Sequence, residues 1–130
     1  MFKKNITPRI SEINGAGHVG HNIIPVWLEE GYIEILKLFN PNFRGKTNVF
    51  MVNINIDYMH EIILGKDVEV ITGIKKIGKA SFVLNQKVFQ AGKLCAKGAT
   101  TFVNSSNISK KSKAIPLHVI KKLQEHILED

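Results

Sequence analysis

The chain has 130 residues, of which 44% are hydrophobic, and this length and composition fit a single domain with a hydrophobic core rather than a disordered chain. Its net charge of +7 permits an anionic partner, but no RNA-binding aromatic motif or helix-turn-helix pattern accompanies it, so we expect no nucleic-acid binding. Cys95 is the only cysteine, which excludes an internal disulfide, leaves no zinc-ligand spacing and indicates a reducing cytoplasm.

A strand is predicted over residues 2–10, and a loop that leads into a long helix follows it. The loop, residues 12–21, is polar and contains three glycines, which allow positive φ and close approach of a ligand. The helix is predicted from Asn22, a good N-cap residue, to about Leu38. The loop therefore brings free N–H groups and the positive end of the helix dipole to one point, which suits an anion or a developing oxyanion.

The predicted helix carries two apolar strips at 100° per residue. The first comprises Ile24, Leu28, Gly31, Ile35 and Leu38, and the second comprises Val26, Ile33 and Leu36. Glu29 points into the second strip, which would place this carboxylate in an apolar setting. Because an unpaired Glu is rarely buried, helix geometry alone favours a solvated edge of the helix instead. Because the segment also carries several charged residues, it is not a membrane span.

Four strands are predicted after the helix, over residues 47–58, 67–76, 80–90 and 93–103. A polar loop and a short helix that begins at Pro116 complete the chain over residues 104–130. One helix followed by a run of strands indicates a single α+β domain, residues 1–130, in which an antiparallel sheet curls around the helix. The second apolar strip and a free sheet edge need cover, which predicts self-association.

The central stretch combines several motifs that together resemble one family. They are Glu12, Asn14, Gly17-His18-Val19, Gly20-His21-Asn22 and Glu29-Glu30, followed downstream by the strand motifs at 56–58, 65–70 and 77–82. Over about residues 4–103 the chain resembles hotdog-fold thioesterases of the 4-hydroxybenzoyl-CoA thioesterase type. The resemblance implies hydrolysis of an acyl-CoA, with coenzyme A only as part of the substrate, no separate cofactor and no metal. It also implies a homodimer or homotetramer with the active site between subunits.

One departure from the family pattern concerns the catalytic carboxylate. The family usually has Asp where this chain has Asn14, and an amide cannot take up a proton at neutral pH. Other hotdog thioesterases have Asn or Gln in the loop and a carboxylate on the central helix, and the 15-residue separation of Asn14 and Glu29 is similar. The resemblance thus implies that Glu29 activates water or attacks the thioester, while Asn14 positions water or substrate.

The remaining candidates in the loop are assigned to oxyanion binding and proton transfer. Backbone N–H groups of Gly20 and His21 are expected to polarise the thioester carbonyl. His18 is a candidate for proton transfer, with the alternative that it holds the loop by a hydrogen bond.

Outside the loop, Ser81 is a candidate for orienting a side chain in the pocket, or else it is inert. Lys75, Lys76 and Lys79 flank a predicted turn and either contact the phosphates of coenzyme A or form a solvated hairpin tip. Two other functions fit the same fold. The first is a non-catalytic acyl-CoA-binding protein, which would lack the catalytic carboxylate; Asn14 in place of the family's Asp is consistent with it. The second is a hydratase or dehydratase, which would need a hydration motif that this sequence does not show.

Overall fold

The structure is a computed structural model that describes residues 1–42, 48–106 and 111–129. Its elements, in chain order, are β1 (Phe2–Ile6), the 3-10 helix η1 (Ile10–Glu12), α1 (Ile24–Phe39), β2 (Val49–Tyr58), β3 (Val68–Ile77), β4 (Ser81–Gln90), β5 (Lys93–Asn104) and α2 (Leu117–Gln124). Thr47, the predicted start of the second strand, and part of the predicted 104–130 tail lie outside the described residues.

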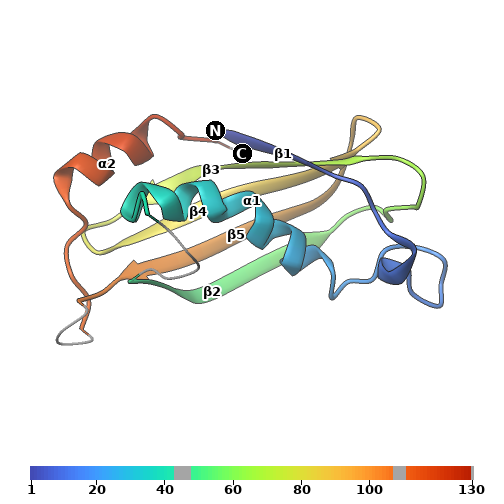
Figure 1. Cartoon of the computed structure of the whole chain (residues 1–130), viewed down its shortest axis with the longest axis horizontal. Helices are drawn as coiled ribbons and strands as arrows, with labels where there is room; N and C mark the ends of the chain where they lie inside the picture. The colour runs from blue at the N-terminus through green and yellow to red at the C-terminus, as the bar shows by residue number, and fades with distance from the viewer. Residues whose placement is uncertain (43–47, 107–110, 130) are drawn as a thin grey trace.

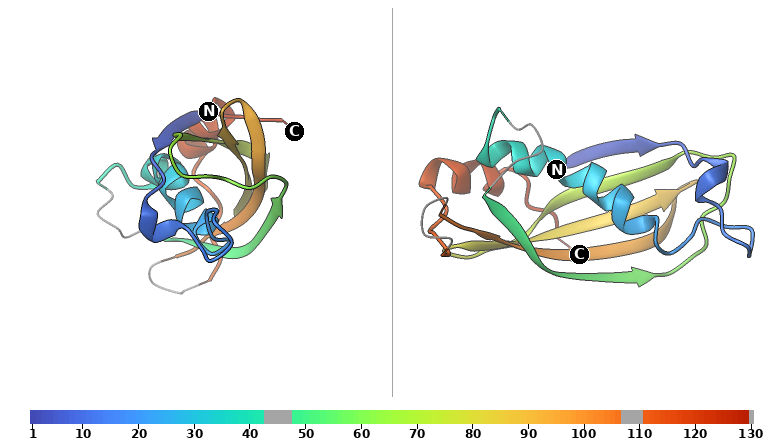
Figure 2. Two further views of the ribbon diagram at one scale, coloured as in Figure 1. Left: turned by 90° about the vertical axis from the view of Figure 1, so that its right-hand side faces the viewer. Right: turned by 60° about the horizontal axis from the view of Figure 1, so that its bottom comes forward.

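The five strands form one antiparallel sheet in the order β1-β3-β4-β5-β2. α1 lies along the concave face of this sheet, and an end-on view shows the strands curling around it (Figures 1 and 2). The α+β class and the curled sheet around one long helix are as the sequence predicts. β1 is shorter than predicted and ends at Ile6, shortly before Pro8, which has no N–H to offer a neighbouring strand.

α1 packs closely on the sheet at Gly31. A Cβ added to Gly31 would lie 2.7 Å from Val70 Cγ1 and 2.9 Å from Thr72 Oγ1. The helix therefore approaches the strands more closely than a residue with a side chain would allow. On either side of this point, Trp27, Leu28 and Ile35 are at most 1% exposed and fill the core.

The helix begins one residue later than predicted, and Asn22 does not cap it. The N-cap residue is Ile23, which makes no side-chain capping bond, and its N–H donates to the carbonyl oxygen of Gly20 at 3.0 Å in a preceding turn. The side chain of Asn22 instead lies over Gly20, with Oδ1 2.5 Å from the place that a Cβ of residue 20 would occupy. A side chain at position 20 would therefore displace the side chain of Asn22.

The C-terminal segment is part of the core and of the sheet edge. Val119 and Leu123 of α2 are buried together with Ile115 at one end of the helix–sheet interface. Beyond α2, His126 O accepts from Ile74 N at 2.7 Å and Leu128 N donates to Ile74 O at 2.9 Å. This tail therefore pairs with the edge of β3 beyond the part that β1 covers.

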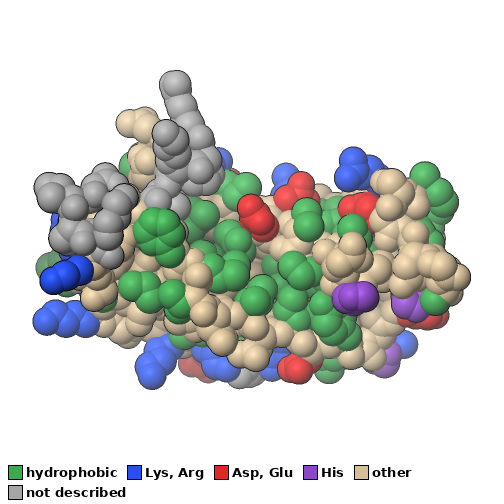
Figure 3. Space-filling model, turned by 90° about the horizontal axis from the view of Figure 1, so that it is seen from below, with side chains coloured by type: hydrophobic (Ala, Val, Ile, Leu, Met, Phe, Trp, Pro, Cys, Tyr) green, Lys and Arg blue, Asp and Glu red, His purple; other side chains and the backbone are tan. Residues whose placement is uncertain are grey.

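The opposite edge of the sheet, β2, is open and apolar. Phe50, Val52 and Tyr58 are 54%, 61% and 53% exposed, and Val26 of α1 is 53% exposed. Seen from the β2 side, hydrophobic side chains extend along much of this face (Figure 3). The sequence predicts that another copy of the chain covers the second apolar strip. For Leu36 this prediction is wrong, because Leu36 is already buried within its own chain, in the same core cluster as Val49. None of the helices in the described ranges is long and apolar enough to cross a membrane.

Candidate active site

The loop between η1 and α1 folds into a tight turn around Asn14. The N–H of Asn14 donates to His18 O at 2.8 Å, and Asn14 O accepts from Gly17 N at 3.1 Å. Asn14 Oδ1 accepts from the N–H of Ala16 at 2.9 Å. Gly17 has φ of +88°, which explains glycine at this position. Because its Oδ1 is engaged, Asn14 offers chiefly its amide nitrogen, a donor, to a ligand.

Two backbone hydrogen bonds hold the end of the loop. Val19 N donates to Ile62 O at 2.8 Å, and Gly20 N donates to Glu12 O at 3.0 Å. The predicted oxyanion donor at Gly20 is thus already engaged within the chain. The N–H of His21 has no protein partner within the described ranges, so it is the one of the two predicted donors that stays open to a ligand.

Glu12 links the loop to α1 through its side chain. This carboxylate is 8% exposed; Oε1 accepts from the N–H of Arg9 at 2.8 Å and Oε2 from Trp27 Nε1 at 3.0 Å. Both oxygens are therefore satisfied, as a buried carboxylate requires. In the sequence Glu12 is only one letter of a motif, and nothing in its neighbourhood indicates that Trp27 is its partner.

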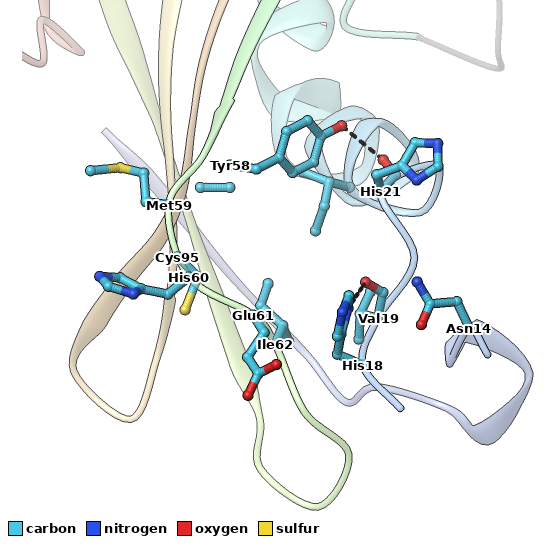
Figure 4. A pocket seen from close by; sticks show the side chains of 12 residues that line it. Asn14, His18, Val19, His21, Tyr58, Met59, His60, Glu61, Ile62 and Cys95 are labelled. Carbon is cyan, nitrogen blue, oxygen red and sulfur yellow. Dashed lines mark hydrogen bonds between the residues drawn. The ribbon is translucent and has the colours of Figure 1, made fainter. Parts of the chain in front are cut away.

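The loop and the chain after β2 border an open cavity of about 320 Å³. Its lining comprises Asn14, His18, Val19, His21, Ile24, Tyr58, Met59, His60, Glu61, Ile62, Cys95 and Ala96. Figure 4 shows Asn14, His18 and His21 on the loop side, facing residues 59–62 and Cys95 across the cavity. The structure therefore brings together three predicted site residues from the loop.

Tyr58 and His18 stabilise this cavity by hydrogen bonds to the loop backbone. Tyr58 Oη donates to the carbonyl oxygen of His21 at 2.8 Å and so ties the end of β2 to the residue whose N–H is open. The Nδ1 atom of His18 lies 3.3 Å from Val19 O, a contact that favours the loop-holding role over proton transfer. Tyr58 belongs to the Ile56-Asp57-Tyr58 motif, which is the only signal of its role in the sequence.

Glu29 does not line the cavity of its own chain. Its side chain is exposed, as expected for a solvated edge of the helix. The apolar setting is wrong for a single chain, because neighbouring Val26 is itself open to solvent. Glu29 does lie near Tyr32: burial raises the pKa of Tyr32 to about 12, and the charge of Glu29 adds to this rise.

The other predicted residues lie at the far end of the molecule. Ser81 opens β4, and its carbonyl oxygen accepts from Gly78 N at 2.7 Å. Lys75, Lys76 and Lys79 belong to the same β3–β4 hairpin, at the left of Figure 1, whereas the loop lies at the right. Within one chain these residues are separate from Asn14, and their roles stay predictions.

The electrostatic effect of Glu29 on Tyr32 can be measured directly. In a Tyr58→Phe background, Tyr32 is the only tyrosine, and we expect its absorbance titration near pH 12. Glu29→Gln should lower this pKa but leave it above the ordinary value, since burial is the larger cause. Because folding raises the pKa of Tyr32, its neutral form stabilises the folded protein fully below about pH 10. This stabilisation is lost as the pH rises through the pKa of Tyr32 in the folded state. An unchanged titration in Glu29→Gln would contradict this electrostatic effect.

A curled antiparallel sheet wrapped around one long helix defines the hotdog fold. The model of the thioesterase-like superfamily matches residues 8–124. The chain belongs to this superfamily. No curated protein matches the sequence.

Solved structures agree with this assignment. A predicted thioesterase from Bacillus stearothermophilus is 36% identical with a TM-score of 0.94, over 99% of this chain and 98% of that one. Two more distant structures share the fold. A thioesterase from Thermus thermophilus, complexed with coenzyme A and Zn, is 18% identical (TM-score 0.87, 95% and 92% covered). A 1,4-dihydroxy-2-naphthoyl-CoA thioesterase from Synechocystis is 21% identical (TM-score 0.81, 95% and 96% covered).

In this chain, the described residues contain no group of three His, Cys, Asp or Glu side chains that could hold a metal ion.

Proposed function

We propose that the protein hydrolyses acyl-CoA thioesters to a free acid and coenzyme A. The observation that carries the proposal is the cavity, whose lining includes Asn14 and His21 together with apolar side chains; the N–H of His21 has no partner among the described residues. Membership of the thioesterase-like superfamily supports it. Cys95 is a free thiol, which fits a reducing cytoplasm.

The proposed chemistry places the thioester carbonyl at the cavity mouth. The N–H of His21 donates to the carbonyl oxygen and stabilises the oxyanion that forms as water adds to the carbon. Asn14 donates its amide hydrogen to the same carbonyl or to the water. The carboxylate of Glu29 takes the proton from water. The carbon–sulfur bond then breaks, the thiolate of coenzyme A leaves and takes up a proton, and the acid is released. No separate cofactor enters these steps.

Glu29 reaches such a site through a second copy of the chain. The open edge of β2 and the neighbouring face of α1 are apolar, and a second copy would cover them in a homodimer or homotetramer. Antiparallel pairing of two β2 strands reverses one copy relative to the other. The α1 face and the lysine-bearing hairpin of one copy would then lie toward the cavity end of the other, which supports the proposed contact between Lys75, Lys76, Lys79 and the phosphates of coenzyme A.

Assembly is expected to be necessary for activity. Sedimentation equilibrium at micromolar concentration should give a dimer or a tetramer. Val52→Lys places a charge on the exposed β2 edge and should shift the protein toward monomer with a parallel loss of hydrolysis. Lys3→Glu, on the exposed β1 strand, is the matched control and should change neither. A wild-type protein that sediments as a monomer would refute the shared site.

Hydrolysis of a panel of acyl-CoA thioesters, detected by the free thiol released, tests the proposed function. Turnover supports the hydrolase. The alternative is a non-catalytic acyl-CoA-binding protein, which Asn14 in place of a carboxylate favours; acyl-CoA binding by calorimetry without thiol release would establish it. Formation or loss of a double bond in the acyl chain, without release of thiol, would instead indicate a hydratase or dehydratase.

A further inference from the structure

A layer of buried polar side chains crosses the sheet beneath the middle of α1. Thr72, Gln86 and Thr100, on β3, β4 and β5, are all 0% exposed. The buried apolar residues on the loop side of this layer form one core cluster, which includes Leu28, and those on the α2 side form another, which includes Ile35. Because hydrogen bonds are directional, a polar layer fixes the position of a helix more specifically than apolar contacts do.

Gln86 joins this polar layer to the helix. Its Nε2 donates to the carbonyl oxygen of Leu28 at 2.9 Å and to Thr72 Oγ1 at 2.9 Å. Its Oε1 is buried and has no hydrogen-bond partner among the described residues. An apolar side chain of similar size would avoid the cost of burying that oxygen. The amide at position 86 therefore contributes chiefly as a donor to α1.

Two glycines fit α1 to the polar layer in one position. A Cβ on Gly31 would lie 2.9 Å from Thr72 Oγ1 and 3.1 Å from Gln86 Nε2. A Cβ on Gly98, which pairs with Gln86 across β4 and β5, would lie 3.0 Å from Leu28 Cδ1. A shift of α1 along the sheet by one residue, about 1.5 Å, would displace Leu28 from Gly98 and misalign the hydrogen bond from Gln86.

Glu29 depends on this attachment, whereas the loop has attachments of its own. The carbonyl oxygen of His21 accepts from Tyr58 Oη of β2 at 2.8 Å, so the loop is held to the sheet independently of Gln86. Glu29 directly follows Leu28, and the carbonyl of Leu28 belongs to the same planar peptide unit as the N–H of Glu29. Gln86 therefore holds the turn of α1 from which the exposed side chain of Glu29 projects.

We infer that Gln86 is a positioning residue for hydrolysis, which holds α1 at the place on the sheet where Glu29 reaches the attacking water. The inference rests on the proposed function, in which Glu29 is the base. When two copies join through β2, the place of Glu29 in the shared site depends on how α1 lies on its own sheet. A displacement of about 1 Å at a reacting group can lower the rate about 10²-fold.

Gln86→Met tests this role, because methionine has a side chain of similar length and no N–H to donate. We expect kcat for the best acyl-CoA of the panel to fall at least about tenfold, with KM nearly unchanged. In a Glu29→Gln background, Gln86→Met should cause no further loss, since both substitutions act on the same group. Wild-type kcat in Gln86→Met, or the same further loss in the Glu29→Gln background, would overturn the inference.

Asn85→Leu is the matched control. Asn85 is the neighbouring amide on β4 and is 1% exposed, but it faces the other side of the sheet, and its Nδ2 donates to Leu128 O of the C-terminal tail at 2.9 Å. Asn85→Leu should lower the urea midpoint of unfolding and leave kcat within about twofold of wild type. An equal fall of kcat in Asn85→Leu and Gln86→Met would mean a general effect on the core and overturn the positioning role.

Should Gln86→Met fail to fold, Thr72→Val is the substitute. It keeps the shape of the side chain and removes one of the two acceptors of Gln86 Nε2. Because the bond to Leu28 remains, we expect a smaller fall of kcat, which again disappears in the Glu29→Gln background. A fall that persists there would count against positioning.

A second readout needs no activity and separates this inference from the proposed function. Tyr32, one turn after Leu28, packs edge-on against Phe102 of β5 with ring centroids 5.1 Å apart, and burial is the main cause of its raised pKa. In the Tyr58→Phe background, Gln86→Met should lower the pKa of Tyr32, because a shifted α1 exposes the hydroxyl. If the wild type hydrolyses no thioester but this pKa falls, the proposed function fails while the attachment of α1 by Gln86 is supported. An unchanged pKa would overturn the attachment itself.

Discussion

Glu29→Gln is expected to lower kcat for acyl-CoA hydrolysis by about 10²–10⁴-fold, the usual cost of losing a general base. The substitution keeps the size of the side chain and removes its ability to accept a proton. KM should change little, since the carboxylate acts on water rather than on the bound thioester. Glu29 is exposed in the single chain, so the variant should fold as the wild type does. Steady-state kinetics with free-thiol detection measures the effect.

Glu30→Gln is the internal control, because Glu30 is the adjacent exposed carboxylate of the same helix. It should leave kcat within about twofold of the wild-type value, as an ordinary surface substitution would. Asn14→Asp separates the two possible positions of the carboxylate. If Glu29 is the base, a second acidic group across the site should perturb its ionisation and slow hydrolysis. Faster hydrolysis in Asn14→Asp, or activity that survives Glu29→Gln, would falsify the assignment of Glu29.

Glu12→Gln is expected to destabilise the protein by about 1–3 kcal/mol. Each carboxylate oxygen of Glu12 accepts from an N–H group, Arg9 N at 2.8 Å and Trp27 Nε1 at 3.0 Å. An amide would turn a donor toward one of them and leave a buried N–H without an acceptor. The loop that presents Asn14 and His21 is connected through Glu12 to α1, so kcat should fall as well. Urea denaturation measures the change in the free energy of unfolding.

Glu34→Gln provides the comparison for charge alone. Glu34 forms a 3.0 Å ion pair with Lys37 on the exposed side of α1, and loss of such a surface pair costs about 0–1 kcal/mol. If Glu12→Gln proved no more destabilising than Glu34→Gln, Glu12 would not connect the loop to the helix as the hydrogen bonds indicate.

Hydrophobic periodicity was sufficient to predict the class of fold. The alternation of apolar residues located β2, β3, β4 and β5 to within a few residues, because a side chain on a strand faces the core at every second position. The glycine-rich loop before α1 was also recognisable, since its residue types restrict the backbone locally. The motifs from Glu12 to Glu30 indicated the superfamily to which the chain belongs.

What the sequence could not indicate are contacts between residues distant along the chain. That Glu12 bonds to Trp27, Tyr58 to His21, and Ile74 to the tail at residues 126–128 depends on how the loop, helix and strands pack. The engagement of Gly20 N–H by Glu12 O likewise follows from the turn that the loop adopts. Residue patterns report which face of an element is buried, but the partner of a polar group is chosen by three-dimensional packing. For that reason the residue pattern was enough to predict the class of fold and the loop that carries the candidate site. Which N–H groups of that loop remain open to a substrate depends on how the loop packs against η1, α1 and the end of β2.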